Sequence, residues 1–211
     1  MRTRFTTYIA AISLLLITSC EDFLNEPISG IQILDNYFQT EEECKKFVAG
    51  CYRGIFQYGE WYGTQFFYVL TESATDDAWL SNPTQAQIDY KDFSQFRVTA
   101  SNDYLYPFWE YMYKDIYQCN IAMGKLAESP VNQSNPALIQ QLIAEVRFIR
   151  AYCYFELAKN FKEIPLLTRV YDANELLEFP LSDQATIFNQ IITDMLALLR
   201  ISLGDHPKVF E

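Results

Sequence analysis

Apolar residues recur every three or four positions along most of this chain, which is the spacing of the buried face of an α-helix. The pattern is interrupted from Glu72 to Ser94, and a stretch of that length without periodicity in a compact domain is usually functional or poorly ordered. The helices that the pattern predicts span about 41–57, 65–70, 103–127 and 136–160, and a last one begins after Ser182.

Local residue choices predict where these helices begin and end. Thr40 and Glu43 have the spacing of a capping box, in which each side chain accepts from the other residue's backbone N–H. Asn135 is an N-cap residue with Pro136 at the first helical position, and Ser129-Pro130 stops the helix before it. Ser182 is expected to cap the last helix, and Ile164-Pro165-Leu166 is expected to be extended.

The helices at 103–127 and 136–160 are joined by a short connection, so they form a long antiparallel pair. Stacked pairs of this kind are the unit of a tetratricopeptide-like array. The sequence therefore predicts an all-α fold of antiparallel helix pairs with long loops. The last helix has no following partner in the sequence, so we expect the array to be incomplete and an apolar face of that helix to be exposed.

A different pattern occupies the first twenty residues. Arg2 and Arg4 precede an apolar stretch that is too short to span a bilayer, and the small residue Ser19 precedes Cys20. This arrangement resembles the signal peptide and lipobox of a bacterial lipoprotein. The resemblance implies cleavage before Cys20 and acylation of its sulfur, which anchors the chain in a membrane.

Acidic residues come directly after the cysteine. Glu21 and Asp22 resemble the signal that sends lipoproteins of Bacteroidota to the outer face of the outer membrane. We therefore expect a lipid-anchored protein that faces the cell exterior. The predicted division of the chain is a signal peptide at 1–19, a lipidated tether at 20–39 and a helical domain at 40–211.

Charge and cysteine content exclude several functions. The net charge is −11, and −13 after cleavage, so the chain has no basic surface with which to bind nucleic acid. His206 is the only histidine and no CxxC occurs, which disfavours a zinc site. Cys44 and Cys51 lie about 10 Å apart along one helix, too far for a disulfide bond. We interpret the four later cysteines as small core residues: Cys44, Cys51, Cys119 and Cys153.

The aperiodic loop contains the best candidates for ligand binding. Trp79 has Asp76, Asp77 and Asn82 nearby in sequence, and sugars are bound by an aromatic face beneath the ring with carboxylates and amides for the hydroxyls. Trp61, between two glycines, is a second candidate. The alternative for both tryptophans is that they pack into the core.

Several segments together resemble one known family. The run from Ala144 to Leu157 is similar to the EAxFLRAxxYFxL signature of SusD/RagB-type outer-membrane lipoproteins, and Ile164-Pro165-Leu166 and 191–195 are similar to their next segments. Lys162-Glu163 stands where the family usually has Gly-Asp, so a left-handed glycine is missing there. The residues that carry this structural signature are Trp109, Tyr113, Asn120, Glu145, Arg147 and Arg150.

These signature residues are expected to be structural. A buried arginine needs a partner, and for Arg150 the candidates are Glu110 and Asp194. The helix residues Trp109, Tyr113 and Asn120 are expected to pack within the helix pair.

The resemblance implies a function and a partner. Such proteins are not enzymes; they cover a TonB-dependent transporter of the SusC type and capture glycans, or peptides in some relatives. It implies no catalytic residue, no metal and no cofactor. Family members are much longer, and their C-terminal half supplies part of the ligand surface, so this chain is expected to be incomplete.

Two other functions remain open from the residues. Glu72, Asp76 and Asp77 are clustered acids in a loop, which a glycoside hydrolase would need, but no nucleophile motif or phosphate loop accompanies them. A chain without the missing half could also serve only to dock to a transporter.

Overall fold

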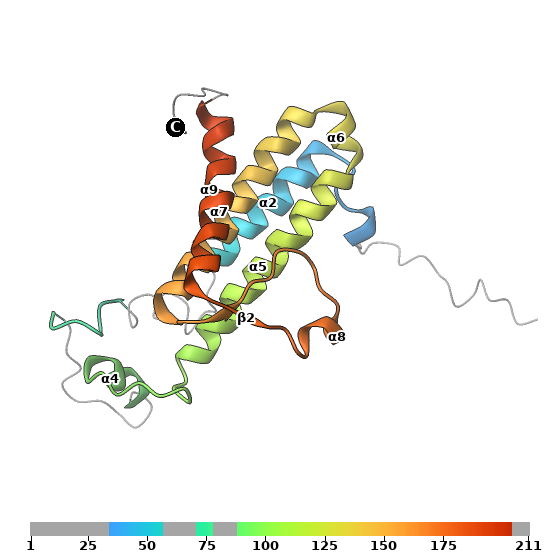
Figure 1. Cartoon of the computed structure of the whole chain (residues 1–211). Helices are drawn as coiled ribbons and strands as arrows, with labels where there is room; N and C mark the ends of the chain where they lie inside the picture. The colour runs from blue at the N-terminus through green and yellow to red at the C-terminus, as the bar shows by residue number, and fades with distance from the viewer. Residues whose placement is uncertain (1–33, 57–70, 78–87, 204–211) are drawn as a thin grey trace, which may run out of the picture. The chain divides into compact units, whose positions relative to one another are not determined.

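The computed structural model describes residues 34–56, 71–77 and 88–203. The chain divides into two units, of which the first ends at Asn36 and contains one described element, the 3-10 helix η2. The second unit begins at Tyr37 and holds the remaining elements (Figure 1). The described elements are η2 (Leu34–Asn36), α2 (Glu41–Phe56), α4 (Ile88–Ser94), α5 (Leu105–Glu128), α6 (Pro130–Ser134), α7 (Pro136–Asn160), β1 (Ile164–Pro165), α8 (Ala173–Leu176), β2 (Leu181–Ser182) and α9 (Gln184–Leu203).

Three long helices determine the shape of the second unit. α7 packs against α5 on one side and α9 on another, and α2 runs alongside both α5 and α7 (Figure 1). The only strands among the described residues are β1 and β2, which pair antiparallel with Ile164 opposite Ser182. The predicted all-α fold of antiparallel helix pairs is therefore confirmed.

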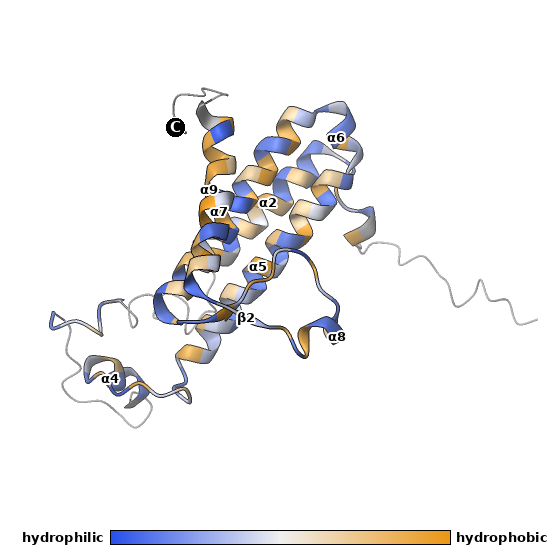
Figure 2. Cartoon of the chain, in the orientation of Figure 1, coloured by the Kyte–Doolittle hydropathy of each residue, from blue (hydrophilic) through white to orange (hydrophobic). Residues whose placement is uncertain are grey.

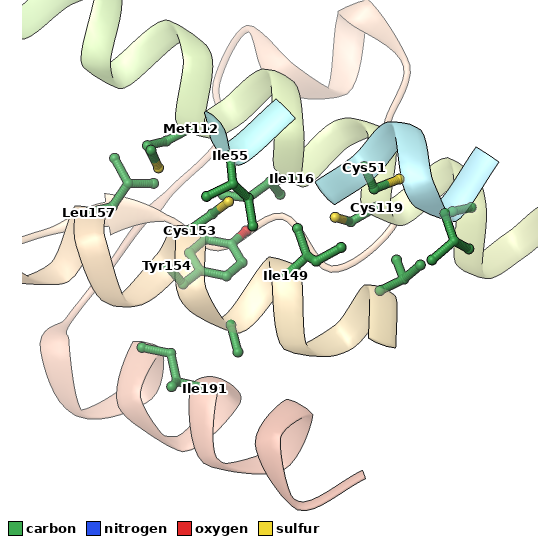
Figure 3. Close-up of a cluster of buried hydrophobic side chains, with 14 of the residues drawn as sticks. Cys51, Ile55, Met112, Ile116, Cys119, Ile149, Cys153, Tyr154, Leu157 and Ile191 are labelled. Carbon is green, nitrogen blue, oxygen red and sulfur yellow. The ribbon is translucent and has the colours of Figure 1, made fainter. Parts of the chain in front are cut away.

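The hydrophobic core lies where α2, α5, α7 and α9 meet. Tyr154, Met112, Ile116 and Leu157 have at most 1% of their surface exposed (Figure 3). All four described cysteines are free thiols in this core, which confirms their interpretation as small buried residues. Figure 2 shows the corresponding apolar stripes along the long helices, with hydrophilic residues on their outer faces.

Most of the predicted helix ends are confirmed. The Thr40 backbone N–H donates to the Glu43 carboxylate at 2.9 Å, and the Glu43 N–H donates to the Thr40 hydroxyl at 3.2 Å. The Asn135 side chain accepts from the Leu138 N–H, as an N-cap does. The prediction for α9 was wrong by one residue, because Ser182 belongs to β2.

Asp183 caps α9 in place of Ser182. Its carboxylate accepts from the Thr186 N–H at 2.8 Å, and its carbonyl accepts from the Ile187 N–H. A carboxylate at this position also interacts favourably with the helix dipole. Accordingly, the pKa of Asp183 is lowered by its hydrogen bonds to Thr186.

Three short helices were not predicted. α4 lies inside the stretch that lacks periodicity, and it packs through Phe93 against Tyr104. α6 follows Ser129, whose hydroxyl accepts from the Asn132 N–H, and α8 lies between the two strands. Each has seven residues or fewer, which is too short for apolar periodicity to show. The helix predicted at 65–70 lies outside the described residues.

The connection after α7 needs no left-handed residue. Phe38 and Phe96 are the only described residues other than glycine with positive φ, at 63° and 53°. The chain therefore passes Lys162-Glu163 without the left-handed glycine whose absence was noted in the sequence.

The last helix keeps an exposed apolar stripe beside its buried face. Ile187 and Ile191 face the core, whereas Phe188 and Ile192 are 38% and 54% exposed. Leu199, two turns further along, is 44% exposed. Within the described residues no helix combines the length and the apolar character that a membrane span requires.

Candidate functional site

The described residues converge on a buried polar junction between α7, α9 and the segment that leaves α7. Arg150 is 4% exposed and Asp194 is 1% exposed. The Arg150 Nε and Nη2 atoms each donate to one carboxylate oxygen of Asp194 at 2.8 Å. Of the two acids considered for Arg150, the structure therefore places Asp194 and not Glu110 against it.

The remaining donor of Arg150 reaches a different helix. Its Nη1 donates to the Asn120 side-chain oxygen at 2.7 Å and to the Thr168 carbonyl at 2.9 Å. The Asn120 amide nitrogen in turn donates to the carbonyls of Leu167 and Arg169, both at 3.0 Å. A buried charge is tolerated only when it is paired and hydrogen-bonded, and these contacts meet that condition.

Two tyrosines complete the support of the exit segment 164–169. The Tyr113 hydroxyl donates to the Pro165 carbonyl at 2.7 Å. The Tyr154 hydroxyl donates to the Leu167 carbonyl at 2.9 Å and accepts from the Leu167 N–H at 2.7 Å. The backbone groups of this extended segment therefore hydrogen-bond to side chains of α5 and α7 instead of to a neighbouring strand.

Burial fixes the protonation of both tyrosines. Desolvation raises the pKa of Tyr113 far above its usual value, and the neighbouring Tyr154 raises it further. Desolvation also raises the pKa of Tyr154, although the hydrogen bond with Leu167 and the charge of Arg150 oppose the shift. Both hydroxyls therefore stay protonated and remain donors throughout the physiological pH range.

The segment beyond the junction is an exposed loop with its own internal contacts. The Arg169 guanidinium lies 3.9 Å from the Tyr171 ring centroid and donates to the Glu175 carboxylate at 2.6 Å. Asp172 and Glu175 form a capping box for α8. Tyr171 also packs edge-on against Phe179, with centroids 4.9 Å apart. These contacts order the loop that the buried junction holds.

The other signature residues have packing or surface contacts. Trp109 is half-buried, with its ring 4.8 Å from that of Tyr113 and 4.9 Å from that of Phe161. Glu145 accepts from the Gln141 amide at 3.0 Å. Arg147 is partly buried, and its Nε has no hydrogen-bond partner among the described residues.

Only two of the candidate ligand-binding residues can be placed. Asp76 and Asp77 lie in a turn over residues 71–77 and are both exposed. The turn is held by Thr75, whose N–H and hydroxyl both donate to the Glu72 carbonyl, at 3.1 Å and 2.7 Å. Trp79, Asn82 and Trp61 lie outside the described residues, as does the predicted lipid anchor, Cys20.

Nothing about the buried junction resembles a reaction centre. It consists of one ion pair, an amide and two protonated phenols. These groups already hydrogen-bond to one another or to the exit segment 164–169. Within the described ranges, no group of three His, Cys, Asp or Glu side chains could hold a metal ion. The junction therefore positions the loop 166–183 and α9.

Some residues of the junction were not assigned a role from the sequence. Tyr154 follows Arg150 by four positions, so the two share a helix face, and that spacing could have indicated a common partner. The contacts among Arg169, Tyr171 and Glu175 lie in a loop without periodicity, and no sequence signal indicated them.

Comparison with known proteins identifies the family. A sequence model of the SusD-like family, described as starch-binding and associating with the outer membrane, matches residues 22–201. The chain belongs to the SusD-like family. This confirms the resemblance based on the α7 signature and its neighbours.

Curated SusD-like relatives match over most of this chain. Two SusD-like proteins of Formosa agariphila are 24% and 27% identical over 190 residues. Both alignments cover 84% of this chain, and 34% and 35% of the relatives. The chain thus spans about a third of the length of the relatives that it matches.

Solved structures of SusD-like proteins share the fold. A laminarin-binding SusD-like protein superimposes with a TM-score of 0.68 at 22% identity, over 78% of this chain and 34% of that protein. A SusD superfamily protein of Parabacteroides distasonis superimposes with a TM-score of 0.63 at 27% identity, over 75% of this chain and 33% of that protein.

Proposed function

We propose that this SusD-like chain takes part in glycan capture at the outer membrane and acts with a transporter of the SusC type. The observation that carries the proposal is the family match over residues 22–201, whose description names starch binding and the outer membrane. One of the structural neighbours is named as laminarin-binding, which adds a second class of glucan. In this role the chain binds its ligand without chemical conversion and is not an enzyme.

The proposed ligand contacts are the loop residues after α2. Asp76 and Asp77 are exposed carboxylates in a turn that Thr75 stabilises, so they can accept from sugar hydroxyls without losing an existing partner within the turn. Trp79 follows two positions later and supplies an aromatic face. Asn82 and Trp61 extend the proposed site.

Calorimetric titration of the full chain with starch and laminarin oligosaccharides tests this site. We expect Trp79→Ala to weaken binding by roughly fivefold to thirtyfold, because stacking on an aromatic ring contributes on the order of 1–2 kcal/mol. Tyr117→Ala is the matched control, since Tyr117 is a half-exposed aromatic residue on α5. Equal affinity of the Trp79→Ala variant and the parent chain would remove Trp79 from the site.

The proposed address depends on Cys20. With two or three acyl chains on this residue the protein is held in the membrane, because a second chain converts reversible binding to stable anchoring. We expect Cys20→Ser to move the chain from the membrane to the soluble fraction of an expressing bacterium, and Cys44→Ser to leave it with the membrane. A Cys20→Ser chain that stayed with the membrane would contradict lipid anchoring.

A further inference from the structure

Two phenylalanines have a left-handed backbone, a conformation that crowds the Cβ atom of an L-residue. Phe38 and Phe96 have φ values of 63° and 53°. Phe38 is 2% exposed, and its ring packs against that of Phe47 with centroids 4.7 Å apart, so core packing offsets the strain. Phe96 is 79% exposed, so its ring receives little packing from the chain that could offset the same strain.

Phe96 occupies the position after α4 that glycine usually takes. Its backbone N–H donates to the Phe93 carbonyl at 3.2 Å, and the Arg97 N–H donates to the Asp92 carbonyl at 2.9 Å. These two bonds form a Schellman motif, whose left-handed residue is most often glycine because glycine has no Cβ. A phenylalanine at this position destabilises the fold, and a strained residue that the fold does not favour is a candidate for function.

The backbone that carries Phe96 is fixed at two further points. Phe93, in the last turn of α4, is 5% exposed and packs edge-on against Tyr104, with centroids 6.4 Å apart. The Asn102 side chain donates to the Asp89 carbonyl at 2.8 Å, which joins α4 to the start of α5. The Phe96 ring is therefore presented to solvent on an ordered backbone.

Polar side chains flank this ring in the sequence. The Arg97 guanidinium donates to the Gln95 side-chain oxygen, lies 3.8 Å from the Asp92 carboxylate and is 66% exposed. In the connection 95–104 between α4 and α5, Phe96 is the only exposed large hydrophobic residue. A protein interface buries a contiguous apolar core, whereas a sugar offers one apolar ring face bordered by hydroxyls. A single aromatic ring among hydrogen-bonding groups fits the sugar better.

We propose that Phe96 is a glycan contact whose exposed ring stacks on the apolar face of a sugar ring. Gln95 and Arg97 have the amide and guanidinium groups that can hydrogen-bond to the sugar hydroxyls. The proposal rests on the glycan capture proposed above and adds a residue that the aromatic and acidic candidates of the preceding loop did not include.

The strain at Phe96 distinguishes this role from a structural one. Removal of a ring that stabilises the fold lowers stability, as it should at Phe38. Removal of the Phe96 ring in favour of glycine should instead raise stability and weaken glycan binding. Proteins retain destabilising residues of this kind where activity depends on them.

Calorimetric titration of the full chain with maltohexaose and laminarihexaose, beside thermal unfolding, tests the proposal. We expect Phe96→Gly to weaken binding by roughly fivefold through the lost stacking. The same variant should raise the thermal midpoint by about 2–4 °C, because glycine adopts the left-handed backbone without strain. Phe96→Tyr keeps the aromatic face and should bind as the parent chain does.

Two variants provide matched controls. Phe38→Gly relieves the same backbone strain but removes a buried ring, so it should lower the midpoint. Tyr117→Ala removes a ring that is 50% exposed on α5 and should leave glycan affinity unchanged.

The outcomes separate this inference from the proposed function. If the parent chain binds a glycan and Phe96→Gly binds it equally well, Phe96 is not a contact and the proposed function stands. A lower midpoint for Phe96→Gly would also overturn the inference, because the ring would then stabilise the fold. A parent chain that bound neither oligosaccharide would overturn the inference together with the proposed function.

Discussion

Arg150 and Asp194 form an ion pair in the core, where either charge would be strongly destabilising without the other. Both are almost fully buried, and the guanidinium makes two hydrogen bonds to the carboxylate. The low dielectric that strengthens their attraction also makes an unpaired partner costly. The pair therefore specifies how α9 sits on α7, because any other arrangement leaves a buried charge.

We expect Asp194→Ala to lower the free energy of unfolding by about 3–5 kcal/mol, since it leaves Arg150 buried and unpaired. That loss is a large share of the 5–15 kcal/mol that is typical of a domain. Urea unfolding followed by circular dichroism measures it. Glu42→Ala, which breaks the exposed pair of Glu42 and Lys46, is the control and should leave the midpoint unchanged. Equal midpoints for the two variants would show that the buried pair does not stabilise the fold.

Asp115 is a buried carboxylate whose Oδ2 has no hydrogen-bond partner among the described residues. Desolvation raises its pKa from 3.8 to about 7, and the charge of Lys114 opposes this only in part. At pH values between these two pKa values, the Asp115 carboxyl is protonated in the folded chain but ionised in the unfolded chain. Stability should therefore fall as the pH rises from about 4 to 7 and level off above that.

Asp115→Asn should remove this pH dependence, because the amide stays neutral. We expect the variant to be more stable than the parent chain at about pH 8, by up to roughly 4 kcal/mol, and similar to it near pH 4. Thermal midpoints at the two pH values measure the difference. An Asn variant that was destabilised equally at both would mean that the carboxylate has a partner whose loss outweighs its desolvation.

At the scale of elements, α9 has two adjacent isoleucines in opposite environments. Ile191 is 6% exposed in the core, and Ile192 is 54% exposed in the apolar stripe with Phe188 and Leu199. We expect Ile191→Ala to cost about 2–4 kcal/mol through the cavity that it leaves, and Ile192→Ala to change stability by less than about 0.5 kcal/mol. Chemical unfolding of both variants decides the matter, and a large cost at Ile192 would show that something covers the stripe.

The long helices could be predicted because their signals are local and repeated. Each of α2, α5, α7 and α9 spans at least four turns, so its apolar face recurs several times. The cap at Thr40 and Glu43 was also predictable, since both partners lie within one turn. The cap of α9 was misplaced by one residue because Ser182 and Asp183 are both good N-cap residues, and the short strand pair selects between them.

The buried junction was only partly predictable. A buried arginine needs an acidic partner, and the sequence offered two candidates for Arg150, Glu110 and Asp194. The sequence could not indicate that Asn120 and Tyr154 bind the same exit segment, because those contacts join positions that are far apart in the chain or go to backbone carbonyls.

At the scale of the molecule, the long helices both form the core and position the loops that leave it. The buried face organises α5, α7 and α9 into one unit, and the loops that leave it carry the exposed groups. Among the described residues these groups include the acidic side chains of the turn at 71–77 and the side chains of Arg169 and Glu175. A chain that spans about a third of the length of its SusD-like relatives thus contains a complete buried junction of Arg150, Asn120 and Asp194.

Glycan binding by the full chain is the central claim, and affinity electrophoresis tests it most directly. The chain is run through native gels that contain starch, laminarin or an unrelated acidic polysaccharide, beside a gel without glycan. We predict clear retardation in at least one of the glucan gels, and its loss in the Trp79→Ala variant. Equal mobility in every gel, from a chain whose circular dichroism shows the helical fold, would contradict the account.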